Sequence, residues 1–214
     1  MSDQDSFINQ IMDEEGITEK QRSIILAAIE SFSEKGYAAT STSEIAKKAG
    51  VAEGTIFRHY KTKKDLLLNI VAPLLSKIMA PFIIKDLYKV LDYKYDHFED
   101  FLRAMLQNRI IFLQKNMALV KILIQEIPFH PELKEEFKEN IARQIFDRYE
   151  KLVVYYQEKG QIINIPPYSI VRMTFSVLFG YLLSRYLLLP EANWNDEQEI
   201  ELTIQFIMHG LVPK

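Results

Sequence analysis

Residues 40–66, TSTSEIAKKAGVAEGTIFRHYKTKKDL, contain two short helical segments separated by a glycine. Ser41 is followed three residues later by Glu44, a spacing typical of a capping box, in which each side chain bonds the backbone N–H of the other residue. The small apolar stripe that follows at helical spacing consists of Ile45, Ala46 and Ala49. Gly50 comes next, and glycine enters the left-handed conformation that ends a helix at little cost. We therefore predict a short helix that begins after Ser41 and ends at Gly50.

A second helix is predicted to begin near Glu53 or Gly54. Its inner side is formed by Ile56, Phe57 and Tyr60. Thr62 and Asp65 repeat the capping spacing, so a further helix begins directly after the second one. Two helices of this length around a glycine-containing turn are typical of a helix-turn-helix.

The charges of this stretch favour a helix-turn-helix that binds DNA. Its end is basic and contains no acidic residue from 58 to 64: the basic residues are Arg58, Lys61, Lys63 and Lys64, with His59 among them. Duplex DNA carries roughly one negative charge per 1.7 Å of its axis, so a basic cluster beside an inserted helix is expected. The small residues Gly54 and Thr55 would let the free N–H groups of the second helix come close to a phosphate or a base edge.

The stretch GYAATSTSEIAKKAGVAEGTIFRHYKTKKDLL resembles the TetR family of bacterial one-component repressors, and with the preceding helix the resemblance covers about residues 20–70. It implies a three-helix DNA-binding domain, a larger all-α domain for ligand binding and dimerisation, and release from the operator when a ligand binds. Phe57 stands where the family often has a tyrosine whose hydroxyl reaches a phosphate, and phenylalanine cannot make that bond.

The DNA-binding residues that we predict combine the resemblance with the charge pattern. They are Ser41, Thr42 and Ser43 at the start of the first helix, Gly54, Thr55, Arg58 and His59 on the second, and Lys61, Lys63 and Lys64 after it. Arg58 and Thr55 are the candidates for reading bases, although Arg58 meeting only phosphate is an equal alternative. The lysines are also compatible with an ordinary solvated run.

The composition predicts an all-α protein. Of 214 residues, 48% are hydrophobic and only 7 are glycine and 8 proline. The absence of cysteine excludes disulfides and zinc–thiolate sites and suits a reducing cytoplasm. The acidic N-terminal residues do not resemble a secretory signal. Arg172 and Arg185 interrupt the most apolar stretch, so we predict no membrane span and a cytoplasmic protein.

We predict an acidic arm at residues 1–18, a helix-turn-helix DNA-binding domain at 19–66, and a ligand-binding and dimerisation domain at 67–214. Helices are expected at 19–35, from 63 onward, from 81 to about 91, at 96–115, 117–127, 132–159, 168–189 and 196–212. Pro73 lies inside one of them and would bend it. That bend is either a hinge between domains or a simple kink.

The last two predicted helices are candidates for self-association. The predicted interface residues are Met173, Val177, Phe179, Gly180, Leu183, Leu187, Ile204 and Met208. Two such helix pairs would form a four-helix interface across a two-fold axis, as an inverted-repeat operator requires. Dimerisation through the last two helices is also what the resemblance implies. The alternative is that both helices are buried within one subunit.

The middle helices supply aromatic and methionine side chains that suit an apolar effector. The predicted pocket residues are Phe101, Met105, Phe112, Leu123, Tyr149, Tyr156 and Phe175. A plain hydrophobic core would show the same pattern.

No catalytic, metal or cofactor site is predicted. The four histidines are scattered, and neither a phosphate-cradling glycine loop nor a hydrolase or metalloprotease motif is present. The function predicted is a homodimeric repressor that binds a double-stranded DNA operator and an unknown small-molecule effector. The alternatives are a TetR-like helical protein-interaction module without DNA binding and a small all-α enzyme.

Overall fold

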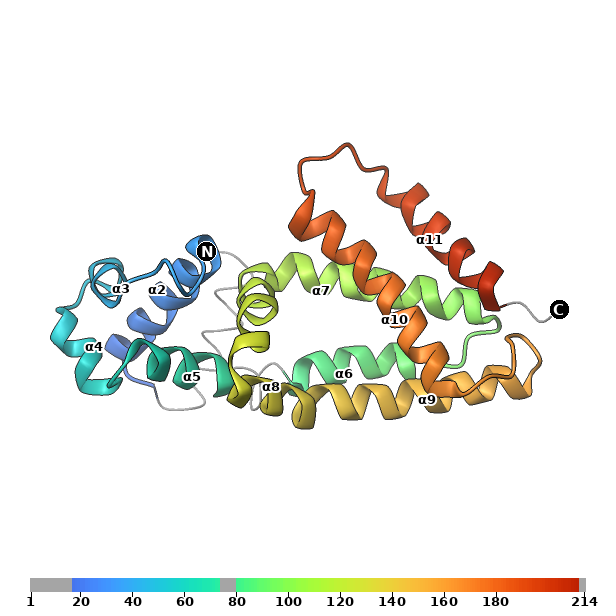
Figure 1. Cartoon of the computed structure of the whole chain (residues 1–214), viewed down its shortest axis with the longest axis horizontal. Helices are drawn as coiled ribbons and strands as arrows, with labels where there is room; N and C mark the ends of the chain where they lie inside the picture. The colour runs from blue at the N-terminus through green and yellow to red at the C-terminus, as the bar shows by residue number, and fades with distance from the viewer. Residues whose placement is uncertain (1–16, 74–79, 212–214) are drawn as a thin grey trace. The chain divides into compact units, whose positions relative to one another are not determined.

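The computed structural model describes residues 17–73 and 80–211, and all of the regular elements in these residues are helical (Figure 1). In chain order the α-helices are α2 (Glu19–Lys35), α3 (Thr42–Ala49), α4 (Glu53–His59), α5 (Lys63–Pro73), α6 (Ala80–Leu91), α7 (Phe98–Glu126), α8 (Pro131–Phe137), α9 (Arg143–Glu158), α10 (Pro167–Leu183) and α11 (Asp196–Leu211). A short 3-10 helix spans Ile127–Phe129, and π-helical turns span Lys138–Ala142 and Ser184–Leu188. The all-α prediction is confirmed.

The helices form two compact units. The first unit is Met1–Phe82 with Leu113–Ile141, and the second is Ile83–Phe112 with Ala142–Lys214. Helix α7 belongs to both, because the chain passes from the second unit to the first within it. This division describes packing, and the domain boundaries drawn from the sequence stay a prediction.

The first unit is built around α2. Its apolar stripe includes Ile24, Ala28 and Phe32, all fully buried. α3 packs on α2, α4 packs on α3, and α5 contacts both α2 and α8. Ile45, Ile56, Leu66 and Leu67 are the fully buried residues that α3, α4 and α5 contribute. Burying a side chain of this size contributes about 1.5–3 kcal/mol, so these residues fix the short helices, which would be marginal alone.

The second unit has an aromatic core. Phe98 and Phe101 on α7 contact Tyr156 and Tyr149 on α9, with ring centroids 5.3 and 5.1 Å apart. Tyr149 donates a hydrogen bond of 2.8 Å to Thr174 on α10, and Tyr156 donates one of 2.8 Å to the carbonyl of Tyr95. Burial raises the pKa of Tyr156 to about 12. α10 packs on α9 and α11, and it runs antiparallel to α11 (Figure 1).

The predicted helix boundaries agree with the structure in part. The break expected between the helices at 96–115 and 117–127 is present, because α7 consists of two helices that meet at Asn116, whose φ of −128° and ψ of 24° are not helical. The long helix expected at 132–159 is divided into α8 and α9 by a π-helical turn. Residues 1–16 of the acidic arm lie outside the described residues. So does the segment 74–79 after Pro73, and the predicted kink is therefore not tested.

Candidate nucleic-acid interface

The turn between α3 and α4 has the local geometry that its sequence predicts. The Ser41 hydroxyl accepts a 3.1 Å hydrogen bond from the backbone N–H of Glu44 and caps α3. Gly50 ends α3 with a φ of 68°, in the left-handed region where a side chain would be strained. The capping box is only half formed, because the Glu44 carboxylate pairs with Lys35 of α2 instead of bonding Ser41. Tertiary packing here replaced a local bond with an ion pair between helices.

Helix α4 is fixed from its inner side and exposed on the other. Ile56 is fully buried and Tyr60 nearly so, whereas Phe57 is 47% exposed. The prediction that Phe57 belongs to the inner side is therefore wrong. A Cβ added at Gly54 would meet no atom within 4 Å, so packing within this chain does not demand a glycine there. The start of α4 consequently has room for a close approach from outside.

Thr42 ties the two helices of the motif together. Its hydroxyl donates a 2.7 Å hydrogen bond to the carboxylate of Glu53, across the turn. Ser41 and Ser43 are exposed at the start of α3, and Thr55 is half-buried at the start of α4. These four residues therefore lie at helix N-termini, where free N–H groups favour anions.

Arg58 at the end of α4 and Lys61 just after it have exposed, positively charged side chains. No hydrogen bond or ion pair holds either side chain within residues 17–73 and 80–211. His59 is also exposed, with its ring 6.3 Å from that of Tyr60. An exposed, uncompensated guanidinium on α4 can meet a phosphate or a guanine edge without first breaking an internal bond.

Lys63 has a different role from the one predicted. Its ammonium donates to the carbonyl oxygens of Tyr37, Ala38 and Thr40, at 2.7, 3.3 and 2.9 Å. It also lies 4.3 Å from the centre of the Tyr37 ring. These bonds satisfy carbonyls in the connection between α2 and α3, and three donors are all that an ammonium has. The structure therefore gives Lys63 internal partners rather than a free charge for phosphate.

Lys64 is paired as well. It donates a 2.7 Å hydrogen bond to Glu132 at the start of α8. This bond raises the pKa of Lys64 and lowers the pKa of the Glu132 carboxyl. Beside it, His130 contacts Glu126 at 3.3 Å and packs edge-on against the Tyr37 ring. Of the predicted basic cluster, Arg58, His59 and Lys61 remain available at the surface.

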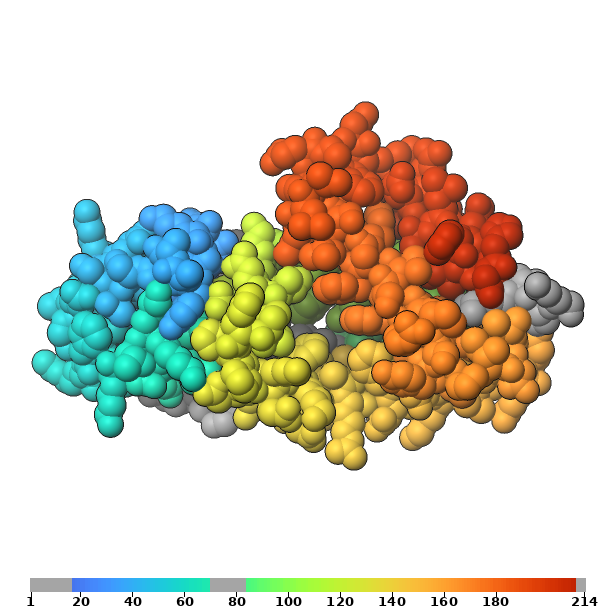
Figure 2. All heavy atoms as spheres, in the orientation of Figure 1, coloured from blue at the N-terminus to red at the C-terminus, as the bar shows by residue number. Residues whose placement is uncertain are grey.

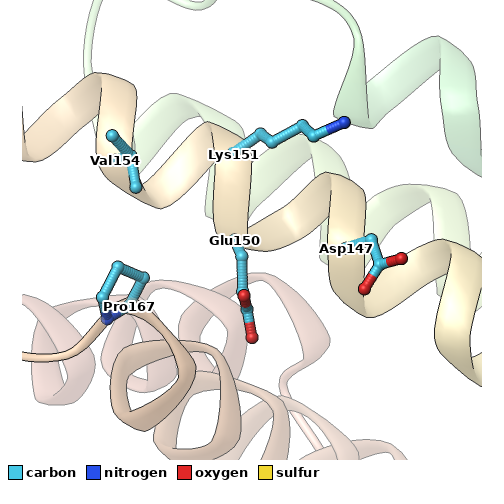
Figure 3. Close-up of a pocket in the computed structure, with 5 residues that line it drawn as sticks. All are labelled: Asp147, Glu150, Lys151, Val154 and Pro167. Carbon is cyan, nitrogen blue, oxygen red and sulfur yellow. The ribbon is translucent and has the colours of Figure 1, made fainter.

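The residues predicted to line an effector pocket do not form one group. Phe101, Met105, Tyr149 and Tyr156 are buried in the second unit, Leu123 belongs to the first unit, and Phe175 is 47% exposed. Phe112 is half-buried. A shallow depression in the second unit is lined by other residues, namely Asp147, Glu150, Lys151 and Val154 of α9 and Pro167 of α10 (Figure 3). Lys151 points away from α10 there, and none of the predicted residues contributes.

The predicted dimer residues are divided between an exposed face and the core. Met173 and Phe179 of α10 are exposed, and Val177, Gly180, Leu183, Leu187 and Met208 are half-buried. Ile204 is fully buried within the subunit, so it does not lie on an exposed face. The sequence reading missed Leu202 and Phe206 of α11, which are 48% and 70% exposed. In Figure 2 the side chains of α10 and α11, in orange to red, form a broad part of the visible surface.

Comparison with known proteins identifies the helix-turn-helix region. Residues 24–70 match the family described as bacterial regulatory proteins, tetR family. Over 51 residues the chain is 47% identical to the fatty acid metabolism regulator protein of Bacillus subtilis (strain 168), a match that covers 24% of this chain and only 26% of that relative. Over 185 residues it is 25% identical to the HTH-type transcriptional regulator AcrR of Shigella flexneri, covering 81% of each chain.

Solved structures share the fold over most of the chain. The fatty acid degradation regulator FadR from Bacillus halodurans is 22% identical, with a TM-score of 0.64 over 89% of this chain and 95% of that one. The TetR family transcriptional regulator PfmR from Thermus thermophilus is 19% identical, with a TM-score of 0.64 over 87% of this chain and 97% of the other. At these identities the likeness establishes the fold. Within the described helices, none is both long and apolar enough to cross a membrane.

Proposed function

Because the chain belongs to the TetR family of bacterial regulatory proteins, we propose that it is a homodimeric transcriptional repressor that leaves an inverted-repeat operator when a small, largely apolar effector binds. The observation that carries the proposal is the α3–α4 motif within the matched residues, with exposed Arg58 and Lys61 at its reading helix. The half-sites would lie about one helical turn (~34–36 Å) apart, or a multiple of it. The protein would act in the cytoplasm.

The dimer would form through the exposed apolar side chains of α10 and α11. They include Met173, Phe179, Leu202 and Phe206. Apolar area on two antiparallel helices suits an isologous contact, in which the same face of each copy packs on the other. Replacing Phe206 with Glu would then give a monomer in analytical ultracentrifugation, whereas Gln198→Glu, at the exposed start of α11, would leave the dimer intact.

Two relatives have names that concern fatty acid metabolism and degradation, which supports an apolar effector for this chain. An effector lowers operator affinity only if it binds the released conformation more tightly than the bound one. Operator release by candidate effectors is therefore measured together with their direct affinity for the protein.

The experiment that tests the proposal is selection of bound fragments from genomic DNA by the purified protein, with the DNA upstream of its own gene included. Enrichment of an inverted repeat, bound with an affinity that falls as salt rises, is the expected result. Folded protein that enriches no sequence at low salt would contradict the proposal and favour a TetR-like protein-interaction module without DNA binding.

A further inference from the structure

Arg109 is a cation in the buried face of α7. The apolar residues of this face in the second unit are Phe98, Phe101, Leu102, Met105 and Leu106. Arg109 follows Met105 by one turn, and its side chain is only 16% exposed. The Phe112 ring lies beneath its guanidinium, with 4.9 Å from Cζ to the ring centre. A positive charge is thus held in surroundings that are mostly apolar.

The hydrogen bonds of Arg109 do not compensate its charge. Nε and Nη2 both donate to one neutral acceptor, the amide oxygen of Asn108. The nearest carboxylate oxygen belongs to Asp86 and lies 3.7 Å from Nη2, beyond hydrogen-bonding distance. That oxygen already accepts a 2.9 Å bond from Asn108, and the other oxygen of Asp86 faces Lys89 at 3.4 Å. Among the described residues, Nη1 of Arg109 has no partner.

Two other arginines of the same unit pair with carboxylates at hydrogen-bonding distance. Arg103 forms a bidentate pair with Glu201, at 2.7 and 2.8 Å, and bonds Glu99 and Asp100 as well. Arg185 forms a bidentate pair with Asp196, at 2.6 and 3.2 Å. These bonds raise the pKa of both arginines, whereas burial lowers the pKa of Arg109 to about 10. Arg109 remains charged at neutral pH, but its carboxylate, Asp86, lies at 3.7 Å rather than at hydrogen-bonding distance.

We propose that Arg109, with Asn108 beside it, binds the carboxylate of an apolar organic acid. Nε and Nη2 are held by Asn108, which leaves the Nη1 end of the guanidinium to donate to a carboxylate, and the Phe112 ring beside it suits an apolar body. A largely buried charge whose carboxylate lies 3.7 Å away is only partly compensated, and a further anion that bonds it directly offsets the remaining cost. The inference rests on the proposed function, because it names the chemical class of the effector.

The test uses the full-length protein and a set of probes with one apolar chain and different head groups. Decanoate, decanol, decylammonium and decanoyl-coenzyme A are titrated by calorimetry. The head-group comparison isolates the anion, because the apolar chain is constant. We expect decanoate to bind about 10- to 100-fold more tightly than decanol, as charge-assisted hydrogen bonds allow, and decylammonium to bind more weakly still.

Variants assign the effect to the residue. Arg109→Gln is expected to reduce decanoate affinity to that of decanol while leaving decanol affinity unchanged, and Arg109→Lys is expected to lie between, because lysine lacks the planar fork. Lys115→Gln, which removes an exposed positive charge of the same helix, is the control and should bind decanoate normally. If Arg109→Gln fails to fold, the affinity of Arg109→Lys for decanoate and the head-group series in the wild type show whether Arg109 binds the carboxylate.

Equal binding of decanoate and decanol, no binding of either, or an Arg109→Gln protein with wild-type affinity for decanoate would each overturn the inference. Tighter binding of decanoyl-coenzyme A that depends on Arg109 would overturn the carboxylate assignment, since its anionic groups are phosphates. Operator binding without ligand is measured separately. If the protein without ligand binds no operator, the proposed function is contradicted. Decanoate binding that depends on Arg109 would still support the carboxylate site in that case.

Discussion

The two units of this protein differ in the surroundings of two arginines, Arg58 in the first unit and Arg109 in the second. In the first unit, the exposed Arg58 and Lys61 lack partners among the described residues, while the neighbouring Lys63 and Lys64 are held by internal bonds. In the second unit, Arg109 is largely buried, and its nearest carboxylate oxygen, on Asp86, lies 3.7 Å away. An exposed free charge fits a polyanion that meets the surface, and a buried one fits a single anion that enters. The difference is therefore the one that the proposed DNA contact and the proposed effector site require.

The largest expected effect comes from removing an outward cation. Arg58→Ala should weaken operator binding about 10- to 100-fold, because one specific arginine contact to a base is worth about 1–3 kcal/mol. Fluorescence anisotropy with the selected operator measures it. Lys89→Ala, whose side chain is 70% exposed in the second unit, is the control and should bind normally. If Arg58→Ala bound the operator with wild-type affinity, the assignment of α4 as the helix that reads the operator would be wrong.

Lys61 and Lys63 are close in sequence but differ in their contacts. The Lys63 ammonium bonds backbone carbonyls of the protein, whereas the Lys61 side chain is exposed. Lys63→Ala should lower the free energy of unfolding by about 1–2 kcal/mol, since three carbonyls lose a charged donor. Lys61→Ala should leave stability unchanged and reduce the slope of log affinity against log salt by about 1. Denaturant titration measures the stability of both variants, and anisotropy at several salt concentrations measures their DNA binding. A loss of stability in Lys61→Ala but not in Lys63→Ala would contradict the different roles of the two lysines.

Arg103 and Arg109 both lie on α7 but differ in how closely carboxylates pair with them, so their substitutions should change stability differently. Arg103→Gln should cost about 0.5–1 kcal/mol, because its pairs are partly solvated. Arg109→Gln without ligand should leave the free energy of unfolding unchanged or raise it, since a poorly compensated buried charge is removed. Urea unfolding of both variants tests this. A larger loss of stability for Arg109→Gln than for Arg103→Gln would mean that Arg109 is structural.

The smallest expected effect is a pH dependence. The hydrogen bond from Arg103 lowers the pKa of Glu201 below its ordinary value of 4.5. The folded state thus favours the ionised carboxylate, so the pair contributes stability above pH 4.5 and loses it as the pH falls through the lowered pKa. Between neutral pH and about pH 3, wild type should lose more stability than Arg103→Gln. Parallel losses in the two proteins would show that the pair contributes nothing.

Local signals made much of the first unit predictable. Ser41 and Thr62 cap the helices that they were predicted to cap, and Gly50 ends α3. A cap depends on atoms within one turn of helix, which a short stretch of sequence contains. The length of α2, Glu19–Lys35, agrees with its predicted range for the same reason.

Side-chain partners were not predictable in this way. Glu44 bonds Lys35 rather than its own cap, and Lys64 bonds Glu132, which is 68 residues away in the chain. The faces of α4 and α11 were also misjudged at Phe57, Ile204 and Phe206, because periodicity gives an apolar stripe without saying which part of it meets a neighbouring helix. Nothing in the sequence indicates that Arg109 is buried, since a single arginine in an amphipathic helix usually keeps its charged end in solvent.

The helical class, the helix-turn-helix, its caps and the likeness of residues 24–70 to the tetR family could be predicted from the sequence, because each of these depends on short-range chemistry. Three features could be found only in the folded structure: the internal bonds of Lys63, the exposed apolar side chains of α10 and α11, and the burial of Arg109 without a carboxylate at hydrogen-bonding distance. The reason is that pairing and burial depend on which distant segments are brought together, and local patterns do not encode those neighbours.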